Sequence, residues 1–114
     1  MRDGTDCANL LRAYVGAWPR DIGGYKDGAR LGFKFHTQSQ RSGELGSKHG
    51  FPCVSRRREG EDYHEYRFKD RATFERARLQ VKAWDMGMPV ATLAAQESLR
   101  PVRQEALALA GGGA

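Results

Sequence analysis

Catalytic chemistry in this chain would have to come from a few scattered histidine and cysteine side chains. Cys53 and His64 could form a nucleophile and base on neighbouring strands, but the sequence shows no group to orient the base and no oxyanion site. A metal site would have to gather His36, His49, His64 and Cys53 from separate elements, without the close ligand pairs of zinc sites. The glycine-rich run GELGSKHG lacks the GxxxxGK[ST] spacing of a phosphate-binding loop. We therefore expect no enzyme, no metal ion and no cofactor.

The basic side chains offer a different chemistry, the binding of a polyanion. The chain has 114 residues, with 19 Lys and Arg against 14 Asp and Glu, for a net charge of +5. Between residues 30 and 58, seven basic residues stand against Glu44 alone, a net charge of 7 − 1 = +6, so the rest of the chain sums to −1. Such a regional charge is typical of a surface that meets a polyanion. A solvated basic face that aids solubility is the alternative.

Composition predicts one small globular domain. The chain is 39% hydrophobic and 29% charged, which is ordinary for a folded protein. No apolar run approaches the roughly 20 residues of a membrane span, and the N-terminal region lacks the apolar block of a signal peptide. We therefore expect a cytoplasmic protein in which Cys7 and Cys53 are small, partly buried free thiols.

The periodicity of the apolar residues predicts the elements that must position these groups. Apolar residues at helical spacing indicate a helix up to Trp18, which Pro19 ends. Alternation of Leu31, Phe33 and Phe35 with polar residues indicates a strand with one buried face. The complete prediction is a helix over 5–18, a loop over 19–29, strands over 31–36, 51–57 and 63–68, a mobile loop over 37–50, and a helix over 70–87.

The predicted fold class is α+β in the order α-β-β-β-α, a three-stranded antiparallel sheet with helices packed on one face and a helical C-terminal tail. Residues 1–87 would form the α+β domain, 88–110 a helical tail that packs on the domain or mediates dimerisation, and 111–114 a disordered end. The core is expected to join sheet residues to helix residues, namely Leu31, Phe33, Phe35, Phe51, Tyr66 and Phe68 to Trp18, Phe74, Val81 and Trp84.

Two segments resemble nucleic-acid-binding designs. The order α-β-β-β-α with a basic loop between strands resembles a double-stranded-RNA-binding domain in outline over residues 5–86. That family has a lysine-rich start to its last helix, whereas KDRATFERARLQ mixes both charges here.

The run KAWDMGMPVATLAAQESLRPVRQEAL resembles a helix-turn-helix of the resolvase or transposase kind. It has Ser98 where a turn glycine is usual and Pro101 where the second helix should start, which favours an ordinary packing or dimerising helix.

The leading functional prediction is a small non-catalytic protein that binds DNA or RNA through its phosphates. Cations interleaved with an aromatic ring on an exposed sheet face, together with a basic loop, would make the contacts. The predicted binding residues are Lys34, His36, Arg41, Lys48, Arg56, Arg57, Arg58, Tyr63 and Arg67.

The alternative is a small protein-binding inhibitor or adaptor, of a size common among phage and mobile-element proteins. The same arginines would then dock on an acidic surface of a host complex, with Tyr63 or Tyr25 as anchors. Either function is compatible with a homodimer through the C-terminal helix around Leu93, Leu99 and Leu107.

Overall fold

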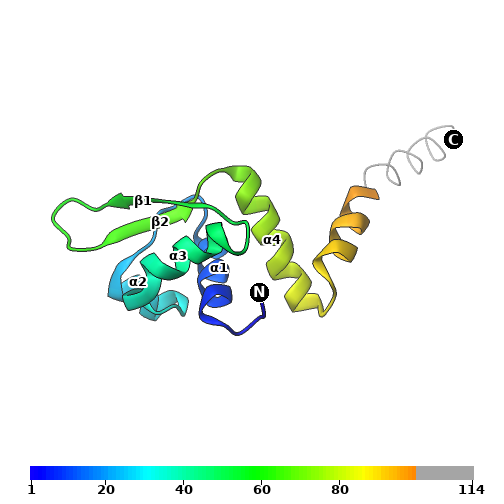
Figure 1. The fold of residues 1–114 in the computed structure, drawn as a ribbon, viewed down its shortest axis with the longest axis horizontal. Coiled ribbons are helices and arrows are strands. Elements are labelled where there is room, and N and C mark those ends of the chain that lie inside the picture. Colours follow the sequence, from blue (N-terminus) through cyan, green and yellow to red (C-terminus); the bar gives the residue numbers. More distant parts are fainter. Residues whose placement is uncertain (100–114) are drawn as a thin grey trace, which may run out of the picture.

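Residues 1–99 are described by a computed structural model of the chain (Figure 1). The labelled elements are α1 (Asp6–Ala17), α2 (Gly24–Leu31), the 3-10 turn η1 (Phe35–Thr37), α3 (Gln38–Ser47), β1 (Cys53–Arg57), β2 (His64–Phe68) and α4 (Arg71–Met86). A further helix covers residues 90–99. The fold is α+β, as the sequence predicts, but the order of its elements differs from α-β-β-β-α.

Helix α1 runs through the centre of the core, as its apolar spacing predicts. Thr5 caps it, because the Thr5 hydroxyl accepts a hydrogen bond from the backbone N–H of Ala8 at 3.2 Å. Leu10, Leu11 and Tyr14 are at most 2% exposed. Burying such side chains stabilises the fold by roughly 1.5–3 kcal/mol each.

The predicted strand over residues 31–36 is wrong. Helix α2 occupies the preceding residues and ends at Gly32, whose φ of 81° is left-handed. Phe33 and Phe35 lie in the turn that follows, where the N–H of Phe33 donates to the carbonyl of Gly28 at 3.0 Å. The alternation of apolar residues that indicates a strand therefore has another origin. Leu31 is the last residue of α2, and Phe33 and Phe35 lie in the turn after it.

The glycines that indicate a loop before residue 30 are instead packing contacts of α2. A Cβ atom on Gly28 would lie 2.7 Å from the carbonyl oxygen of Phe33. A Cβ atom on Gly24 would lie 2.7 Å from the ring of Tyr63, on the hairpin. Only glycine allows these approaches. Glycine usually destabilises helices, but here the packing of α2 requires it.

The predicted mobile loop over residues 37–50 is also wrong, because most of it forms α3. The buried side of α3 is largely polar: Gln38 and Ser42 are 3% and 5% exposed, and Leu45 is fully buried. A polar inner face carries no hydrophobic periodicity, which is the signal that a sequence offers for a helix.

The sheet is a two-stranded antiparallel hairpin, with Arg57 of β1 opposite His64 of β2. Ile22 alone stands where a third strand would pair. It donates to the carbonyl of Tyr66 at 3.0 Å and accepts from the Tyr66 N–H at 2.8 Å. The predicted three-stranded sheet and the outline of a double-stranded-RNA-binding domain are therefore not confirmed.

Phe68 joins the hairpin to the core. Its ring is fully buried and lies edge-on to Tyr14, with 5.8 Å between centroids, and 6.2 Å from Trp18. Trp18 in turn stacks on Phe74 of α4 at 5.2 Å. Phe33 and Phe68 are buried as predicted, and the other predicted core residues are partly buried against the same cluster. The main additions are Leu10, Leu11, Tyr14, Ile22 and Leu45.

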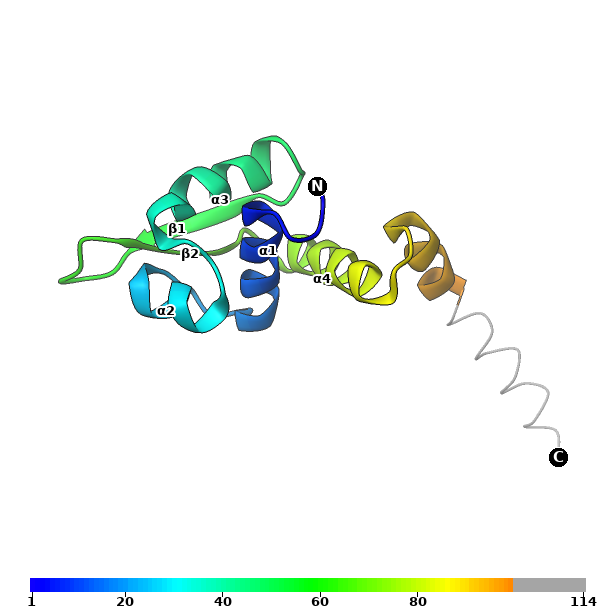
Figure 2. The same cartoon turned by 90° about the horizontal axis from the view of Figure 1, so that it is seen from below.

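Helix α4 and the helix over 90–99 extend to one side of the other elements (Figures 1 and 2). Asp70 caps α4 and Gly87 ends it with a φ of 64°, both as predicted. Glu97 ties the last described helix to α4 through an ion pair with Lys82 at 2.9 Å.

The predictions for residues 100–114, which include Pro101 and Leu107, lie outside the described residues. Within residues 1–99, no helix combines the length and apolarity needed to cross a membrane.

Candidate nucleic-acid interface

Two consecutive helices joined by a short turn lead directly into the hairpin. Helix α2 is followed by Gly32 to Lys34 and η1, then by α3, and β1 starts six residues after α3 ends. Figure 2 shows α2 and α3 on the two sides of the hairpin strands. The order is therefore helix, a six-residue connection that contains η1, helix and β-hairpin.

The inner face of α3 is fixed by buried hydrogen bonds. The hydroxyls of Ser42 and Tyr14 lie 2.7 Å apart. The Gln38 amide donates to the Tyr14 hydroxyl at 3.1 Å and to the carbonyl of Ile22 at 3.0 Å. Because buried polar groups without partners are costly, this network holds α3 in one rotation about its axis. Burial raises the pKa of the Tyr14 hydroxyl, and the hydrogen bonds with Ser42 and Gln38 offset only part of that rise.

The opposite side of α3 is exposed, uncharged and small. We call Ser39, Gln40, Gly43 and Ser47 the outer face of α3. Gln40 and the two serines present hydrogen-bonding groups that can reach the edges of nucleic-acid bases. Gly43 has no side chain, and a Cβ atom there would meet no atom within 4 Å. A surface of this kind lets the helix backbone approach a partner closely.

Cations flank this outer face. Arg41 and Lys48 share the Glu44 carboxylate, at 2.8 and 3.9 Å. The hydrogen bond from Arg41, with a further one from Cys7, lowers the pKa of Glu44. The Glu44 side chain is only 18% exposed, whereas that of Lys48 is 65% exposed. The carboxylate is therefore largely covered by protein, and the Lys48 ammonium group that it orients is open to solvent.

A groove of about 240 Å³ separates the start of α3 from the hairpin. His36 and Ser39 line it from the helix side, and Tyr63 and His64 line it from the hairpin side. His36 and Tyr63 were both predicted to bind nucleic acid, and the structure brings them together. His36 belongs to η1 and Tyr63 to the hairpin, whereas the sequence predicts both on strands of one sheet.

The nine predicted binding residues do not form a single exposed sheet face. Lys34 lies in the turn before η1 and pairs with Asp6 at 3.5 Å. Arg56 and Arg67 share the carboxylate of Asp21 on the side of the hairpin away from the buried face. The physical reason is the two-residue period of a strand, which turns Arg56 and Arg57 to opposite faces.

Arg57 lies on the hairpin face that carries Tyr66 and Phe68, and so on the side of the helices. Arg58 follows the end of β1, and its guanidinium lies 3.5 Å from the hydroxyl of Tyr63. Residues 1–99 supply no carboxylate within 4.0 Å of either guanidinium.

The sequence prediction missed the outer face of α3 entirely. A usable signal exists in the spacing of Gln38, Ser42 and Leu45, at i, i+4 and i+7. This spacing puts Gln38, Ser42 and Leu45 on one side of a helix, and it could have indicated a helix whose inner face is largely polar.

The structure does not assemble the Cys53–His64 pair. Cys53 is opposite Phe68 and His64 is opposite Arg57, four register positions away, or roughly 13 Å along the strands. The Cys53 thiol donates to the carbonyl of Phe51 at 3.4 Å, and burial raises its pKa to about 12. A thiol in that state is a poor nucleophile.

In residues 1–99, no three His, Cys, Asp or Glu side chains gather where they could hold a metal ion.

Comparisons with protein-family models, with curated proteins and with solved structures find no match to this chain.

Proposed function

We propose that this chain is a non-catalytic nucleic-acid-binding module that places α3 in the major groove of duplex DNA. The observation that carries the proposal is the exposed, uncharged outer face of α3, the second of two consecutive helices that lead into a hairpin. Winged helix-turn-helix domains have the same order of two helices followed by a hairpin, and this analogy of element order supports the proposal at that level alone. The major groove, about 12 Å wide, admits an α-helix of about 10–12 Å diameter.

The side chains of the outer face suit base edges. A glutamine such as Gln40 can make two hydrogen bonds to adenine, and serines can donate to or accept from any base. Gly43 leaves room for the helix to enter without a side chain between its backbone and the bases. Contacts of this kind specify sequence, in contrast to contacts with phosphates.

Phosphate contacts would come from Lys34, Arg41 and Lys48 around α3 and from Arg57 on the hairpin. The cations of Lys34 and Lys48 are exposed, and ion pairs of this kind contribute only about 0–1 kcal/mol, so a phosphate can replace or share their carboxylate partners. Arg41 is half-buried and donates two hydrogen bonds to Glu44, so a phosphate there would share Arg41 with that carboxylate. Glu59 and Glu61 at the hairpin tip are expected to stay away from the duplex. Asp62 lines the groove beside Ser39, so we expect the phosphates to pass on the side of Lys34 and Lys48 and not over this groove.

Duplex DNA fits this surface better than duplex RNA. The major groove of an A-form RNA helix is deep and too narrow for side chains on a helix to read it. DNA is therefore the polymer favoured by an α-helix as the reading element.

Replacing Arg57 and Lys48 together by Ala should weaken binding to unrelated DNA duplexes alike. Each lost phosphate contact removes about 0.9 from the slope of log affinity against log salt concentration, so the slope should fall by between about 1 and 2. Fluorescence anisotropy of a labelled duplex between about 50 and 200 mM NaCl measures both quantities.

Arg56→Ala is the matched control for this experiment. It removes a neighbouring arginine of β1 that faces the other side of the hairpin. The proposal predicts little change in the slope for the control. The same loss per removed charge in the control and in the double variant would show that only net charge matters.

We further propose that the module acts in the cytoplasm. Dimerisation through the C-terminal helix stays a prediction: Leu93 is 3% exposed, Leu99 is 49% exposed, and Leu107 lies outside the described residues. A two-fold dimer would place two copies of α3 on half-sites about one helical turn apart.

A further inference from the structure

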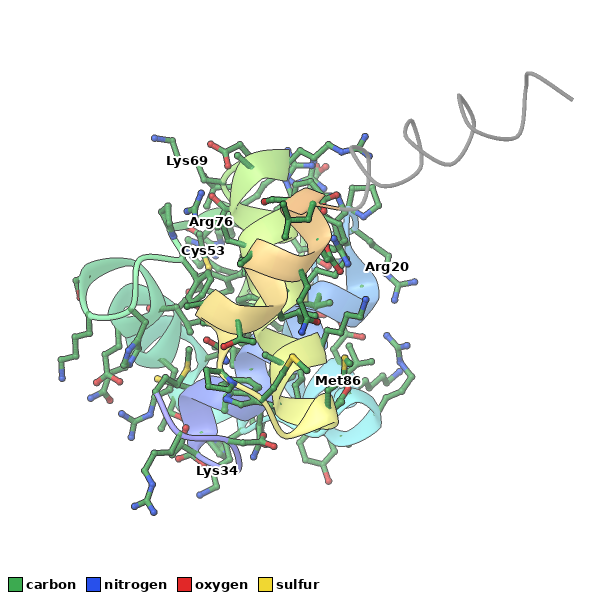
Figure 3. All side chains as sticks on the ribbon, turned by 90° about the vertical axis from the view of Figure 1, so that its right-hand side faces the viewer. Arg20, Lys34, Cys53, Lys69, Arg76 and Met86 are labelled. Carbon is green, nitrogen blue, oxygen red and sulfur yellow. The ribbon has the colours of Figure 1, made fainter. Side chains whose placement is uncertain are left out.

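The side of the hairpin turned away from its buried face carries a second polar surface. A hollow of about 470 Å³ is lined there by Arg20, Asp21, Asp27, Arg30, Arg56, Arg58 and Glu65. Another hollow, also of about 470 Å³, is lined by Tyr25, Lys26, Arg58, Glu61 and Tyr63. The two hollows adjoin, because Arg58 lines both. We call this surface the arginine face, and Figure 3 places Arg20 on the opposite side of the molecule from the green helix α3.

Carboxylates beneath the arginine face orient its guanidinium groups. Asp21 lies 3.2 Å from Arg56, and Asp27 lies 2.9 Å from Arg30. The side chains of Asp21 and Asp27 are 19% and 24% exposed, whereas those of Arg56 and Arg30 are 75% and 54% exposed. The acids are thus largely covered and the arginines reach outward. An incoming group meets positive charge first.

Two further guanidinium groups of this face have no acidic partner among residues 1–99. Arg20 and Arg58 have no carboxylate within 4.0 Å there, and the Arg58 guanidinium donates to the hydroxyl of Tyr63 at 3.5 Å. Glu65 and Glu61 line the same hollows at longer distances. A guanidinium presents five N–H donors in a planar fork that matches a carboxylate with two parallel hydrogen bonds. These two residues are therefore the free binding groups of the face.

An exposed aromatic ring lies beside them. Tyr25 is 69% exposed, and its ring is supported edge-on by Phe35 at 5.4 Å between centroids. Tyrosine and arginine are the residue types most enriched at the energetic centres of protein interfaces. A ring held in place loses little further entropy when a partner covers it.

The mixed charge of the face favours a protein partner over a second nucleic acid. Glu61 and Glu65 line the hollows beside the arginines and would repel a continuous phosphodiester chain. A polypeptide can present acids to Arg20 and Arg58 and leave uncharged side chains opposite the glutamates. It can also cover Tyr25 with an apolar side chain.

From these observations we infer that the arginine face docks an acidic segment of a partner protein. Carboxylates of that segment bind the guanidinium groups of Arg20 and Arg58, and an adjacent apolar side chain packs on Tyr25. The site is centred on Arg20 and Arg58, away from the outer face of α3, although Tyr63 lines both its second hollow and the groove beside Ser39. We expect the protein segment and a DNA duplex to bind at the same time. The inference stands independently of the DNA-binding proposal.

The test uses the full chain and a fluorescein-labelled peptide of about twelve residues composed of Asp, Glu and Leu. Fluorescence anisotropy at about 100 mM NaCl measures its affinity for the unchanged protein and for two variants. Arg20→Ala with Arg58→Ala should weaken binding at least tenfold. Arg71→Ala with Arg76→Ala, which removes two exposed arginines of α4 that line neither hollow, should stay within about twofold of the unchanged protein. Circular dichroism checks that both variants are folded.

A second arm adds unlabelled DNA duplex to the peptide complex. Retention of the peptide supports two separate sites. Displacement of the peptide by DNA, equal losses in the two variants, or no peptide binding at about 1 mM protein would each overturn the inference.

Discussion

Replacing Gly43 by Glu should weaken DNA binding at least about 30-fold while leaving the protein at least as stable as before. Gly43 lies inside α3 at an exposed position, its φ is not left-handed, and a Cβ atom placed on it would meet no atom within 4 Å. Exchanging a glycine for a helix-forming residue there should stabilise the fold by about 0.5–1 kcal/mol. The new carboxylate would lie against the duplex, where a like charge costs on the order of 2–3 kcal/mol, or a loss of roughly 30–150-fold in affinity.

Gly16→Glu provides the control for that variant. Gly16 is exposed in the last turn of α1 and also has free space around its Cβ position, so the substitution and the change in net charge are the same. Any difference in stability that comes from its place near the helix end is measured separately from DNA binding. Urea denaturation and anisotropy with one DNA duplex compare the two variants directly. If Gly16→Glu weakens DNA binding as much as Gly43→Glu, or if Gly43→Glu binds normally, α3 is not the contacting helix.

Phe68→Ala should have the largest effect on stability, about 3–5 kcal/mol. Phe68 is fully buried at the meeting point of β2, α1 and Trp18, and its ring contacts cannot be replaced by neighbours without leaving a cavity. A loss of this size is a large part of the roughly 5–15 kcal/mol by which small domains are stable. The free energy of unfolding from urea titration, with the slope m checked for constancy, gives the measurement.

Val54→Ala serves as the comparison, because Val54 is 40% exposed on the other face of the same hairpin. We expect it to cost less than about 1 kcal/mol. A loss of under about 1 kcal/mol for Phe68→Ala would contradict the position of Phe68 at the centre of the core.

Strong apolar periodicity and capping residues made part of the fold predictable. The helix up to Trp18, the helix from Asp70 to Gly87 and the two strands of the hairpin all follow from patterns that the structure confirms within a few residues. The two helices and β2 have an apolar buried side, and the helix ends carry residues suited to their backbone conformation.

The region between Pro19 and Gly50 could not be predicted by the same means. The glycines of α2 are there because other atoms occupy the space of a Cβ, and Gln38 and Ser42 of α3 are buried through hydrogen bonds with Tyr14 and Ile22. Both features depend on tertiary contacts that a local pattern does not contain.

The candidate site was predictable in its chemistry and not in its arrangement. The excess of basic residues between positions 30 and 58 is real, but the structure distributes them between two opposite faces. Lys48 and Arg57 lie on the side of α3, whereas Arg56 and Arg58 line the arginine face. Only the assignment of β1 and its register could separate them, because neighbouring strand residues point in opposite directions.

The most direct test of the DNA-binding account is a titration of the isotope-labelled full chain with a DNA duplex, followed by amide chemical shifts in NMR spectra. We predict that the largest changes fall on Ser39, Gln40, Gly43 and Ser47, with smaller changes at Arg57. The amides of Arg20 and Tyr25 should barely move. Large changes on that second surface, with α3 unchanged, would contradict the account.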